Sequence, residues 1–456
     1  MAIDEVLATG LCVGCGVCAA HAPQNFEMKI NLYGRLEASR IKIHSAEIDK
    51  SVSLVCPFSG IGKDESDLAR ELFPNSSHSH ELLGLYESIY AGHVETSEFR
   101  SLGSSGGMGS WILSEALQRR MVDGVIHVRP ATALREDGRI FEYRISRTID
   151  EIASGAKSKY YPVELSAVLT EALAFPGKLA VIGVPCFLKA IRRLADQRPI
   201  FRSKLGLVVG LLCGQLKGTT FGSLLAWQCG IEPAAITGLD FRVKQIGKPA
   251  NQYAMAATGR KTGTTAEASV TLPMASLYGA DWGYGFFKYK ACDYCDDVFA
   301  ETADIVIGDA WLPEFDHDWR GTNVVIARLP AMSQLIAQGI ESGQLALNHL
   351  DPNSAIRTQD ASIRHRRDEL PYRLSLAKRR NEWFPAKRCQ PDRTALDFGR
   401  KAIQRLRSRI RDVSDKAFLA AVRKNDLGSF FRALGPYVFA YRIIRKFFVV
   451  QAGKRP

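Results

Sequence analysis

Three cysteines lie close together near the start of this chain, in Cys12-Val-Gly-Cys15-Gly-Val-Cys18, and Cys56-Pro57 follows at a distance. A spacing of three residues with glycines between lets a tight loop direct three thiolates to three corners of an iron–sulfur cube, and the distant Cys-Pro supplies the fourth. A zinc site instead needs two separated cysteine pairs and seldom uses such a run. The spacing therefore predicts a ferredoxin-like module with one [4Fe–4S] cluster on Cys12, Cys15, Cys18 and Cys56.

Ten cysteines in 456 residues are too few for a disulfide scaffold. The start of the chain lacks the basic and apolar segments of a signal peptide, so we expect the reducing cytoplasm. With 46% hydrophobic and 24% charged residues, the chain is able to bury substantial cores. It offers no run of about 18 apolar residues, so no spanning helix is expected.

The net charge of +12 lies almost entirely in the C-terminal tail, where fifteen Lys and Arg face four acids between Leu396 and Pro456. No nucleic-acid-binding module accompanies this charge, so we do not expect a nucleic-acid partner. The stretch 430–450 mixes aromatic and aliphatic residues with cations, which make insertion across a bilayer costly. Two alternatives stay open: a helix at the inner membrane surface among anionic headgroups, or a helix docked on the body or on a partner subunit.

Four other cysteines have less distinctive surroundings. Cys186 and Cys213 each follow an apolar run typical of a buried parallel strand, and the ends of such strands are where α/β sheets place ligands. The pair Cys292-Asp-Tyr-Cys295 is compatible with a redox disulfide, half of a zinc site or chance. Buried structural thiols remain an alternative for Cys186 and Cys213.

The order of apolar runs and turns predicts a chain of α/β and α+β character. We expect an iron–sulfur module over 1–60, a polar linker over 61–84 and a mostly parallel α/β domain over 85–236. A mixed α+β second half follows over 237–390, and a basic helical tail over 391–456.

A glycine-rich turn, Gly103-Ser-Ser-Gly-Gly-Met-Gly109, lies between an expected strand and an expected helix. Small residues there let backbone N–H groups approach an anion, so the turn favours phosphate binding, with a merely tight turn as the alternative. A bulky residue at Gly106 would block that approach. Lys157-Ser-Lys159-Tyr160 combines cations with a phenol ring, and its alternative is a solvated strand edge.

Taken in order, the motifs of this chain resemble the beta-subunit family of coenzyme F420 hydrogenase and dehydrogenase, which includes 7-hydroxymethyl chlorophyll a reductase. The motifs are Cys12/Cys15/Cys18 with Cys56-Pro57, Ser104-Ser-Gly-Gly107, Lys157-Ser-Lys-Tyr160, Gly183-Val-Pro-Cys186, Leu212-Cys213-Gly, Phe241-Arg242-Val-Lys244, Cys292-Asp-Tyr-Cys295 and Ala303-Asp-Ile-Val-Ile-Gly-Asp309.

The resemblance implies an iron–sulfur flavoprotein oxidoreductase with FAD in the central domain. The residues implied for FAD are Ser104, Ser105, Gly106 and Gly107 on the nucleotide, and Lys157, Ser158, Lys159 and Tyr160 beside the isoalloxazine or its phosphates. It also implies a second [4Fe–4S] cluster on Cys186, Cys213, Cys292 and Cys295. No catalytic acid or base is apparent in the sequence.

Clusters exchange single electrons whereas a flavin exchanges one or two, so we expect electron transfer between a ferredoxin-like donor or partner subunit and a small organic substrate or coenzyme. The motifs indicate binding of a cluster and a flavin, and they do not indicate whether the protein uses F420. The alternative is a non-catalytic electron-transfer subunit of a larger complex. Family relatives also occur beside polysaccharide-synthesis genes, which makes a sugar substrate conceivable.

Overall fold

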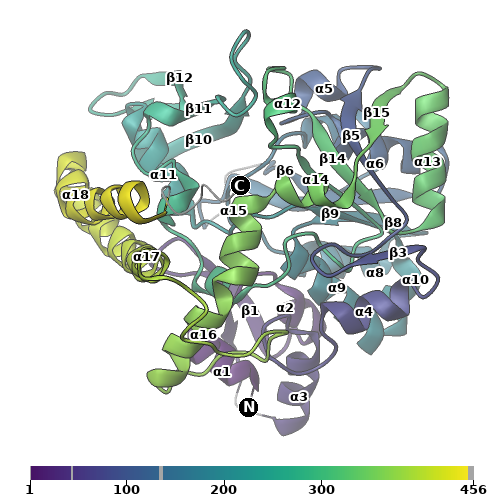
Figure 1. The fold of residues 1–456 in the computed structure, drawn as a ribbon, viewed down its shortest axis with the longest axis horizontal. Helices are drawn as coiled ribbons and strands as arrows, with labels where there is room; N and C mark the ends of the chain where they lie inside the picture. Colours follow the sequence, from purple (N-terminus) through teal and green to yellow (C-terminus); the bar gives the residue numbers. More distant parts are fainter. Residues whose placement is uncertain (1, 43–44, 133–136, 450–456) are drawn as a thin grey trace.

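The computed structural model describes residues 2–42, 45–132 and 137–449, and its centre is an eight-stranded sheet of order β15-β5-β14-β13-β9-β8-β6-β7 (Figure 1). Its strands are β5 (Ser88–Val94), β6 (Gly124–Pro130), β7 (Phe141–Ser146), β8 (Leu179–Gly183), β9 (Leu205–Leu211), β13 (Ile305–Asp309), β14 (Asn323–Ala327) and β15 (Leu345–His349).

The sheet is mixed: the strands predicted over 85–236 pair mostly in parallel, and antiparallel pairing enters through β7 and through strands of the second half. The four central strands β13, β9, β8 and β6 run parallel. On the flanks, β14, β15 and β7 each pair antiparallel with their neighbours. Apolar runs reveal buried strands but carry no information on direction, which depends on how the chain returns between them.

The sheet also takes strands from both sides of the predicted boundary at residue 236. Strands β13, β14 and β15 come from the segment 237–390 and continue the sheet begun by β5 to β9. The two predicted segments therefore share one sheet, and a separate three-stranded antiparallel sheet lies beside it (Figure 1). That smaller sheet consists of β10 (Ile231–Val243), β11 (Ala254–Lys261) and β12 (Glu267–Pro273).

Alternate residues of the central strands enter two different cores, as the period of two in a strand requires. Val208 packs on one face, whereas Leu207 and Val209 pack on the other. Helices α8 (Ser166–Ala174), α9 (Pro185–Gln197) and α10 (Pro199–Lys204) contribute to the first core. Helices α6 (Met108–Gln118), α7 (Ile149–Ser154) and α13 (Pro330–Glu341) contribute to the second.

The N-terminal module packs on the same sheet face as α9, because Val17 and Val55 belong to that core. It consists of α1 (Ala2–Ala8), α2 (Val17–His21), the hairpin of β1 (Phe26–Ile30) and β2 (Leu36–Arg40), and α3 (Ala46–Val55). The predicted linker 61–84 holds α4 (Glu65–Leu72) and the start of a second hairpin, β3 (His78–His80) with β4 (Gly84–Tyr86). Its polar composition reflects in part a capping box, in which Asp64 and Asp67 each accept the other's backbone N–H.

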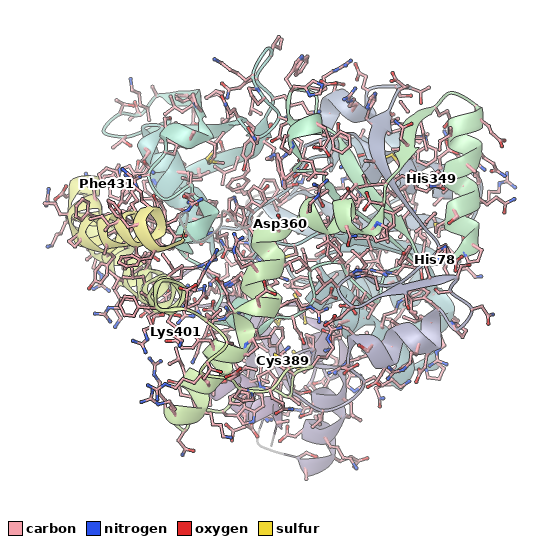
Figure 2. The ribbon with its side chains drawn as sticks, viewed as in Figure 1. His78, His349, Asp360, Cys389, Lys401 and Phe431 are labelled. Atoms are coloured by element: carbon pink, nitrogen blue, oxygen red, sulfur yellow. The ribbon has the colours of Figure 1, made fainter. Side chains whose placement is uncertain are left out.

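Short helices connect the remaining parts of the fold. They are α5 (Phe99–Leu102), α11 (Thr219–Gln228), α12 (Pro313–Asp316), α14 (Pro352–Arg357), α15 (Asp360–Ile363) and α16 (Leu370–Arg379). Three 3-10 turns lie at Met274–Ser276, Trp282–Tyr284 and Lys290–Tyr294, and π-helical turns at Arg364–Asp368 and Arg445–Val449. The half-buried Cys389 lies in the segment between α16 and the tail (Figure 2).

The predicted helical tail is a hairpin of α17 (Phe398–Lys424) and α18 (Leu427–Ile444) on one flank of the molecule, marked in Figure 2 by Lys401 and Phe431. Phe430 and Leu434 of α18 are fully buried in a core shared with α11 and β10. Residues 450–456 of the predicted tail lie outside the described residues. Within the described chain, no helix has the length and apolar character needed to cross a membrane.

Candidate functional site

The first cysteine quartet is built by a local loop and one distant helix end. Cys12 and Cys15 lie in the loop before α2, Cys18 lies in its first turn, and Cys56 follows the last residue of α3. The loop depends on glycine, because Gly14 has φ +70° and a Cβ there would lie 2.5 Å from the Leu36 carbonyl oxygen. All four thiols are free and mutually within electrostatic range.

Backbone N–H groups donate to one sulfur of this quartet, whereas burial disfavours the charged form of the thiols. The backbone N–H groups of Gly14 and Ala38 both donate to the Cys12 Sγ at 3.4 Å. Burial raises the pKa of Cys56 to about 11 and, together with the neighbouring thiols, raises the pKa of Cys18 well above its usual range. Four thiolates in this place therefore need a cationic partner, which is what the irons of a cluster supply.

The second quartet comes from three separate segments that the fold brings together. Cys186 lies in the first turn of α9 and Cys213 follows β9, both at the carboxyl ends of parallel strands. Cys292 and Cys295 lie in and directly after the 3-10 turn Lys290–Tyr294. All four line one small cavity, and the Leu216 N–H donates to the Cys292 Sγ at 3.2 Å.

Arg366 is the charged residue of that cavity, and sequence analysis did not single it out. Its guanidinium donates to the Cys295 Sγ at 3.2 Å and lies 3.6 Å from the Cys213 Sγ. The residue lies in the π-helical turn Arg364–Asp368, and such turns occur frequently at functional sites. No cysteine or glycine pattern in the sequence marks this segment.

The two quartets are neighbours. Val13 of the first cysteine loop and Phe58, two residues beyond Cys56, both line the cavity of the second quartet. Cys15 and Cys186 are close enough for each thiol to contribute to the raised pKa of Tyr143. Helix α9 connects the sites, because it carries Cys186 at one end and Arg193, which donates to the Cys56 carbonyl, two turns later.

Within the described chain, no three His, Cys, Asp or Glu side chains form a group that could hold a single metal ion. A cubane separates its four thiolates by more than one ion does, because the sulfurs bind different irons. The absence of such a group among the described residues therefore concerns sites for a single metal ion and not sites for a cluster. Cys229 lies apart from both quartets, buried in the core that α11 shares with the tail.

The glycine-rich turn and the segment 157–160 lie against each other, as the resemblance implied. The turn connects α5 to α6, and the Ser104 hydroxyl accepts from the Ser158 N–H at 2.7 Å. Ser104 also donates to the Ser158 hydroxyl at 3.2 Å. Ser105 is buried and donates to the Thr322 carbonyl oxygen at 2.8 Å.

Packing constrains Gly106 independently of any ligand. A Cβ there would lie 2.7 Å from the Gly92 carbonyl oxygen and 2.8 Å from the Asn323 Oδ1. The glycine is thus required by packing against β5 and β14, and a bulky residue would disturb the protein itself. Substitution of Gly106 cannot distinguish loss of a ligand from loss of fold.

Three cations that sequence analysis did not assign surround the turn. Arg242 is buried and donates to the Ser104 carbonyl at 3.2 Å and to the Tyr160 hydroxyl at 3.1 Å. Lys244 donates to the Ser105 carbonyl at 3.0 Å and to the carbonyl of the third cation, Arg100. The motif Phe241-Arg242-Val-Lys244 contains two of these three cations, whereas no sequence motif contains Arg100.

Three cations of this region have a carboxylate partner: Arg242 pairs with Asp309 at 2.9 Å, Arg100 with Asp318 at 2.8 Å and Lys157 with Asp240 at 2.5 Å. Lys159 and Lys244 instead donate to carbonyl oxygens, so these two ammonium groups are the ones that favour an anion. Burial, reinforced by the charges of Arg100, Arg242 and Lys157, lowers the pKa of Lys244 to about 7. Burial, with a contribution from Lys157, also lowers the pKa of Lys159 to about 8, although Asp240 acts in the opposite direction. An ammonium whose pKa is depressed by neighbouring cations gains stability when an anion binds beside it.

An aromatic wall lies between the turn and the second quartet. The Tyr160 ring meets Trp282 edge-on at 4.7 Å between ring centres, and Phe241 lies 5.5 Å from Tyr160. Gln215, two residues beyond Cys213, donates to the Trp282 carbonyl at 3.1 Å. Its Oε1 is buried with no hydrogen-bond partner among the described residues.

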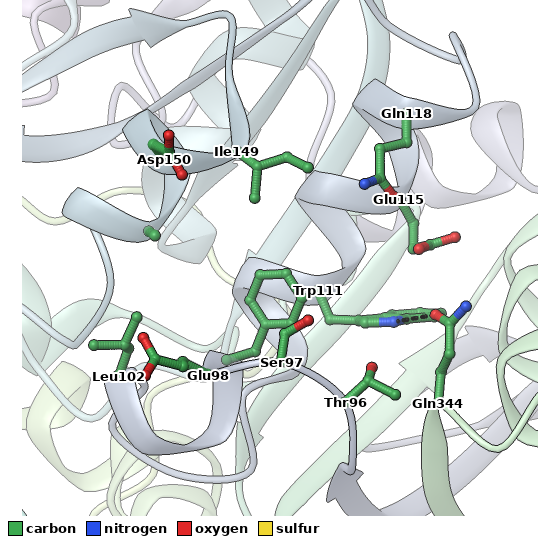
Figure 3. Close-up of a pocket in the computed structure, with 12 residues that line it drawn as sticks. Thr96, Ser97, Glu98, Leu102, Trp111, Glu115, Gln118, Ile149, Asp150 and Gln344 are labelled. Carbon is green, nitrogen blue, oxygen red and sulfur yellow. Dashed lines mark hydrogen bonds between the residues drawn. The ribbon is translucent and has the colours of Figure 1, made fainter.

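A separate pocket of about 470 Å³ lies beside α6 and α7 (Figure 3). Glu98, Glu115 and Asp150 line it, and Trp111 donates to the Gln344 Oε1 at 2.9 Å across its floor. None of the predicted site residues lines this pocket. Its carboxylates make it unsuitable for phosphate, in contrast to the cationic turn.

Comparison with known proteins shows the family of this chain. A model described as coenzyme F420 hydrogenase/dehydrogenase, beta subunit N-term, matches residues 89–170. The corresponding model for the C terminus of the beta subunit matches residues 177–353, so the two span more than half of the chain. The chain belongs to the coenzyme F420 hydrogenase/dehydrogenase beta-subunit family.

Individual relatives of this beta-subunit family are distant in sequence. The chain is 24% identical over 271 residues to coenzyme F420 hydrogenase subunit beta of Methanothermobacter thermautotrophicus, covering 58% of this chain and 84% of that protein. It is 25% identical to coenzyme F420 hydrogenase subunit beta of Methanococcus voltae, covering 59% of this chain and 86% of that protein. A chain in the F420-reducing [NiFe] hydrogenase complex of Methanosarcina barkeri is similar at a TM-score of 0.48 and 17% identity, over 66% of this chain and 96% of that one.

The family models cover some candidate sites and leave others outside. The beta-subunit spans include Ser104 to Gly107, Lys157 to Tyr160 and all four cysteines of the second quartet. The first quartet, Arg366 and the α17–α18 hairpin lie beyond both spans.

Proposed function

We propose that this member of the beta-subunit family is an iron–sulfur flavoprotein oxidoreductase. Its two quartets would hold [4Fe–4S] clusters, and FAD would bind at the glycine-rich turn, for two-electron reduction or oxidation of an organic substrate or coenzyme. The observation that carries the proposal is that neighbouring sites share contacts. Val13 of the first cysteine loop lines the cavity of the second quartet, and Gln215 beyond Cys213 donates to Trp282. Trp282 meets Tyr160, whose hydroxyl accepts from Arg242 at the turn. When bound, the clusters supply one-electron transfer and the flavin links it to two-electron chemistry.

The residues of the chain perform three tasks in this proposal. The eight thiolates bind iron, and the backbone N–H groups of Gly14, Ala38 and Leu216 donate to their sulfurs, which stabilises negative charge. Arg242, which pairs with Asp309 at 2.9 Å, and Lys244 hold the glycine-rich turn, and Lys244 with Lys159 provides positive charge for a pyrophosphate. The buried cores around the second quartet exclude water from it.

The N-terminal module lies at one end of the molecule (Figure 1). In the first quartet Cys12 and Cys56 are half-buried and the other two cysteines are buried, whereas in the second quartet Cys186 alone is half-buried. A ferredoxin-like donor or partner subunit would therefore exchange electrons at the first quartet. In this proposal the organic substrate binds at the opposite end of the sequence of sites, beside the turn.

The test is chemical analysis of anaerobically purified protein. We expect about eight irons, about eight sulfides and one FAD per chain. Cys213→Ser should halve the iron content, whereas Cys229→Ser, a buried cysteine outside both quartets, should leave it unchanged. Equal iron in the two variants, or absence of flavin from the wild type, would contradict the proposal.

A second candidate is an electron-transfer subunit without its own substrate site. The names of the matched relatives favour it, since they are subunits of a hydrogenase. A link to polysaccharide synthesis belongs to this alternative. Turnover of F420 or another acceptor by the isolated chain with a reduced low-potential donor would exclude it, and turnover only after a partner is added would support it.

We also propose that the tail brings this protein to the inner membrane surface. One face of α18 is docked on the body, so only its other face is available to contact a membrane. On α18 Phe439 is 66% exposed, and Phe447 in the π-helical turn that follows is 51% exposed, with the Lys446 ammonium 5.6 Å from its ring centre. Exposed aromatic side chains among cations suit an interface with anionic lipid headgroups.

Vesicle co-sedimentation tests this association with the complete chain, because deletion of α17 and α18 would uncover a core. We expect binding to anionic vesicles at low salt, weakened by the pair Phe439→Ser and Phe447→Ser and by high salt. Ile246→Ser, at an 82% exposed residue distant in sequence, is the matched control. Equal binding of both proteins would place the function of the tail elsewhere, in a protein interface.

A further inference from the structure

We propose that Arg366 is a positioning residue that raises the reduction potential of the second cluster. The inference rests on the proposed function, because it concerns the quartet of Cys186, Cys213, Cys292 and Cys295. It extends that function to a residue beyond the span that the beta-subunit models match.

Arg366 is aimed at the quartet by its backbone. The Glu369 N–H donates to the Arg364 carbonyl at 2.9 Å, five residues earlier, which is the hydrogen bond of a π-helical turn. This wider turn joins α15 to α16 and places Arg366 beside the cavity. The side chain is 1% exposed, so it has no access to bulk water.

The contacts of Arg366 are with sulfur and carbonyl groups. Nη1 donates to the Cys295 Sγ at 3.2 Å and to the Asp297 carbonyl. Nη2 lies 3.6 Å from the Cys213 Sγ and donates to the Gly214 carbonyl at 2.7 Å. The carbonyls fix the plane of the guanidinium and leave its remaining N–H groups directed at two cysteines from different segments.

No carboxylate neutralises this charge among the residues that the structure describes. Among other buried arginines, Arg411 pairs with Asp293, whereas Arg328 and Arg373 bond to neutral groups. Arg366 differs from these because its contacts include two cysteines. A guanidinium is always charged in proteins, and a buried charge without a counter-charge is strongly unfavourable. The groups beside Arg366 that can carry the balancing negative charge are the cysteines of the quartet, as thiolates bound to a cluster.

This charge has a definite effect on the potential. A reduced cluster carries one more negative charge than an oxidised one, so a nearby cation with N–H···S bonds stabilises the reduced form and raises the potential. The first quartet has no equivalent contact in the described structure. Arg193 reaches the Cys56 carbonyl rather than a sulfur, and the donors to the Cys12 Sγ are neutral backbone N–H groups. The asymmetry favours electron transfer from the first cluster to the second.

The experiment is a potentiometric titration of the anaerobically purified full-length protein, followed by electron paramagnetic resonance. In Arg366→Met, we expect the midpoint of one cluster to move to a more negative potential while the other stays unchanged. Arg366→Lys keeps the charge but loses the two-pronged geometry, so its shift should be smaller. Arg373→Lys is the matched control, because Arg373 is equally buried and bonds to the Asp293 carbonyl, His365 and Gln404 rather than to cysteine.

Unchanged midpoints in Arg366→Met with full iron content would overturn the inference, as would an equal shift in Arg373→Lys. Loss of half of the iron in both Arg366 variants would overturn it too, since Arg366 would then be needed for assembly rather than for the potential. A wild-type protein with only one cluster would instead refute the proposed function, and iron analysis reveals that case before any titration.

Discussion

Replacement of Lys244 by methionine tests the flavin site most directly, because it removes a cation without filling the turn. The Lys244 Nζ donates to the Ser105 carbonyl at 3.0 Å, and burial with the neighbouring cations lowers its pKa to about 7. A charge-assisted hydrogen bond to a phosphate contributes about 1.5–3 kcal/mol. Its loss should weaken FAD binding by about 10- to 150-fold.

The same pKa predicts how flavin affinity depends on pH. Below about pH 7 Lys244 is protonated before FAD binds, whereas above that pH binding must first recover a proton. Affinity should therefore fall as the pH rises from 6 to 8.5, by at most about tenfold per unit for this one group. In Lys244→Met that part of the pH dependence should disappear.

Fluorescence titration of FAD into flavin-depleted protein measures both effects, and iron content confirms that the cluster region is intact. Lys248→Met is the matched control, since Lys248 is exposed four residues further along the chain. A dissociation constant in Lys244→Met within twofold of wild type, or an unchanged pH profile, would refute the placement of the pyrophosphate at this turn.

Two further predictions concern the first quartet and the docking of the tail. Cys15→Ser replaces a soft thiolate by a poor iron ligand, so iron should fall by about one cluster per chain, and unchanged stoichiometry and absorption would contradict the assignment. Asp415→Ala removes the partner of Arg35, whose Nη2 lies 2.7 Å from the carboxylate where α17 meets the N-terminal hairpin. Because it strands a largely buried guanidinium, it should reduce the free energy of unfolding by about 3 kcal/mol. Chemical denaturation measures the change, and a loss below about 1 kcal/mol would show that water solvates Arg35.

In the tail, the pattern of apolar residues predicts that a helix forms but not which of its faces packs on the body. The residues 430–450 predicted a helix with an apolar face, and α18 confirms the helix. Which face is docked depends on Phe286 and Phe287, which come from a distant segment and pack against Phe430. The exposed Phe439 and Phe447 have similar side chains, so composition does not distinguish them from the buried ones.

The direction of the outer strands follows the same principle. The apolar run of β14 is readable as a strand from local sequence, whereas β7 alternates polar and apolar residues and was not predicted. Each of these strands pairs antiparallel with the strand just before it in the chain, β13 and β6. Their direction therefore depends on how the chain returns and not on the pattern of the strand itself.

The sequence by itself determined the features that a few adjacent residues control. The loop of Cys12, Cys15 and Cys18 needs only its spacing and glycines that adopt positive φ. The resemblance implied the second quartet and included Arg242 and Lys244 among its motifs, but only the tertiary structure shows how these residues meet and adds Arg100 and the guanidinium of Arg366. Parallel strand ends and a π-helical turn bring together residues up to 180 positions apart, from Cys186 to Arg366, and no local pattern records such an encounter.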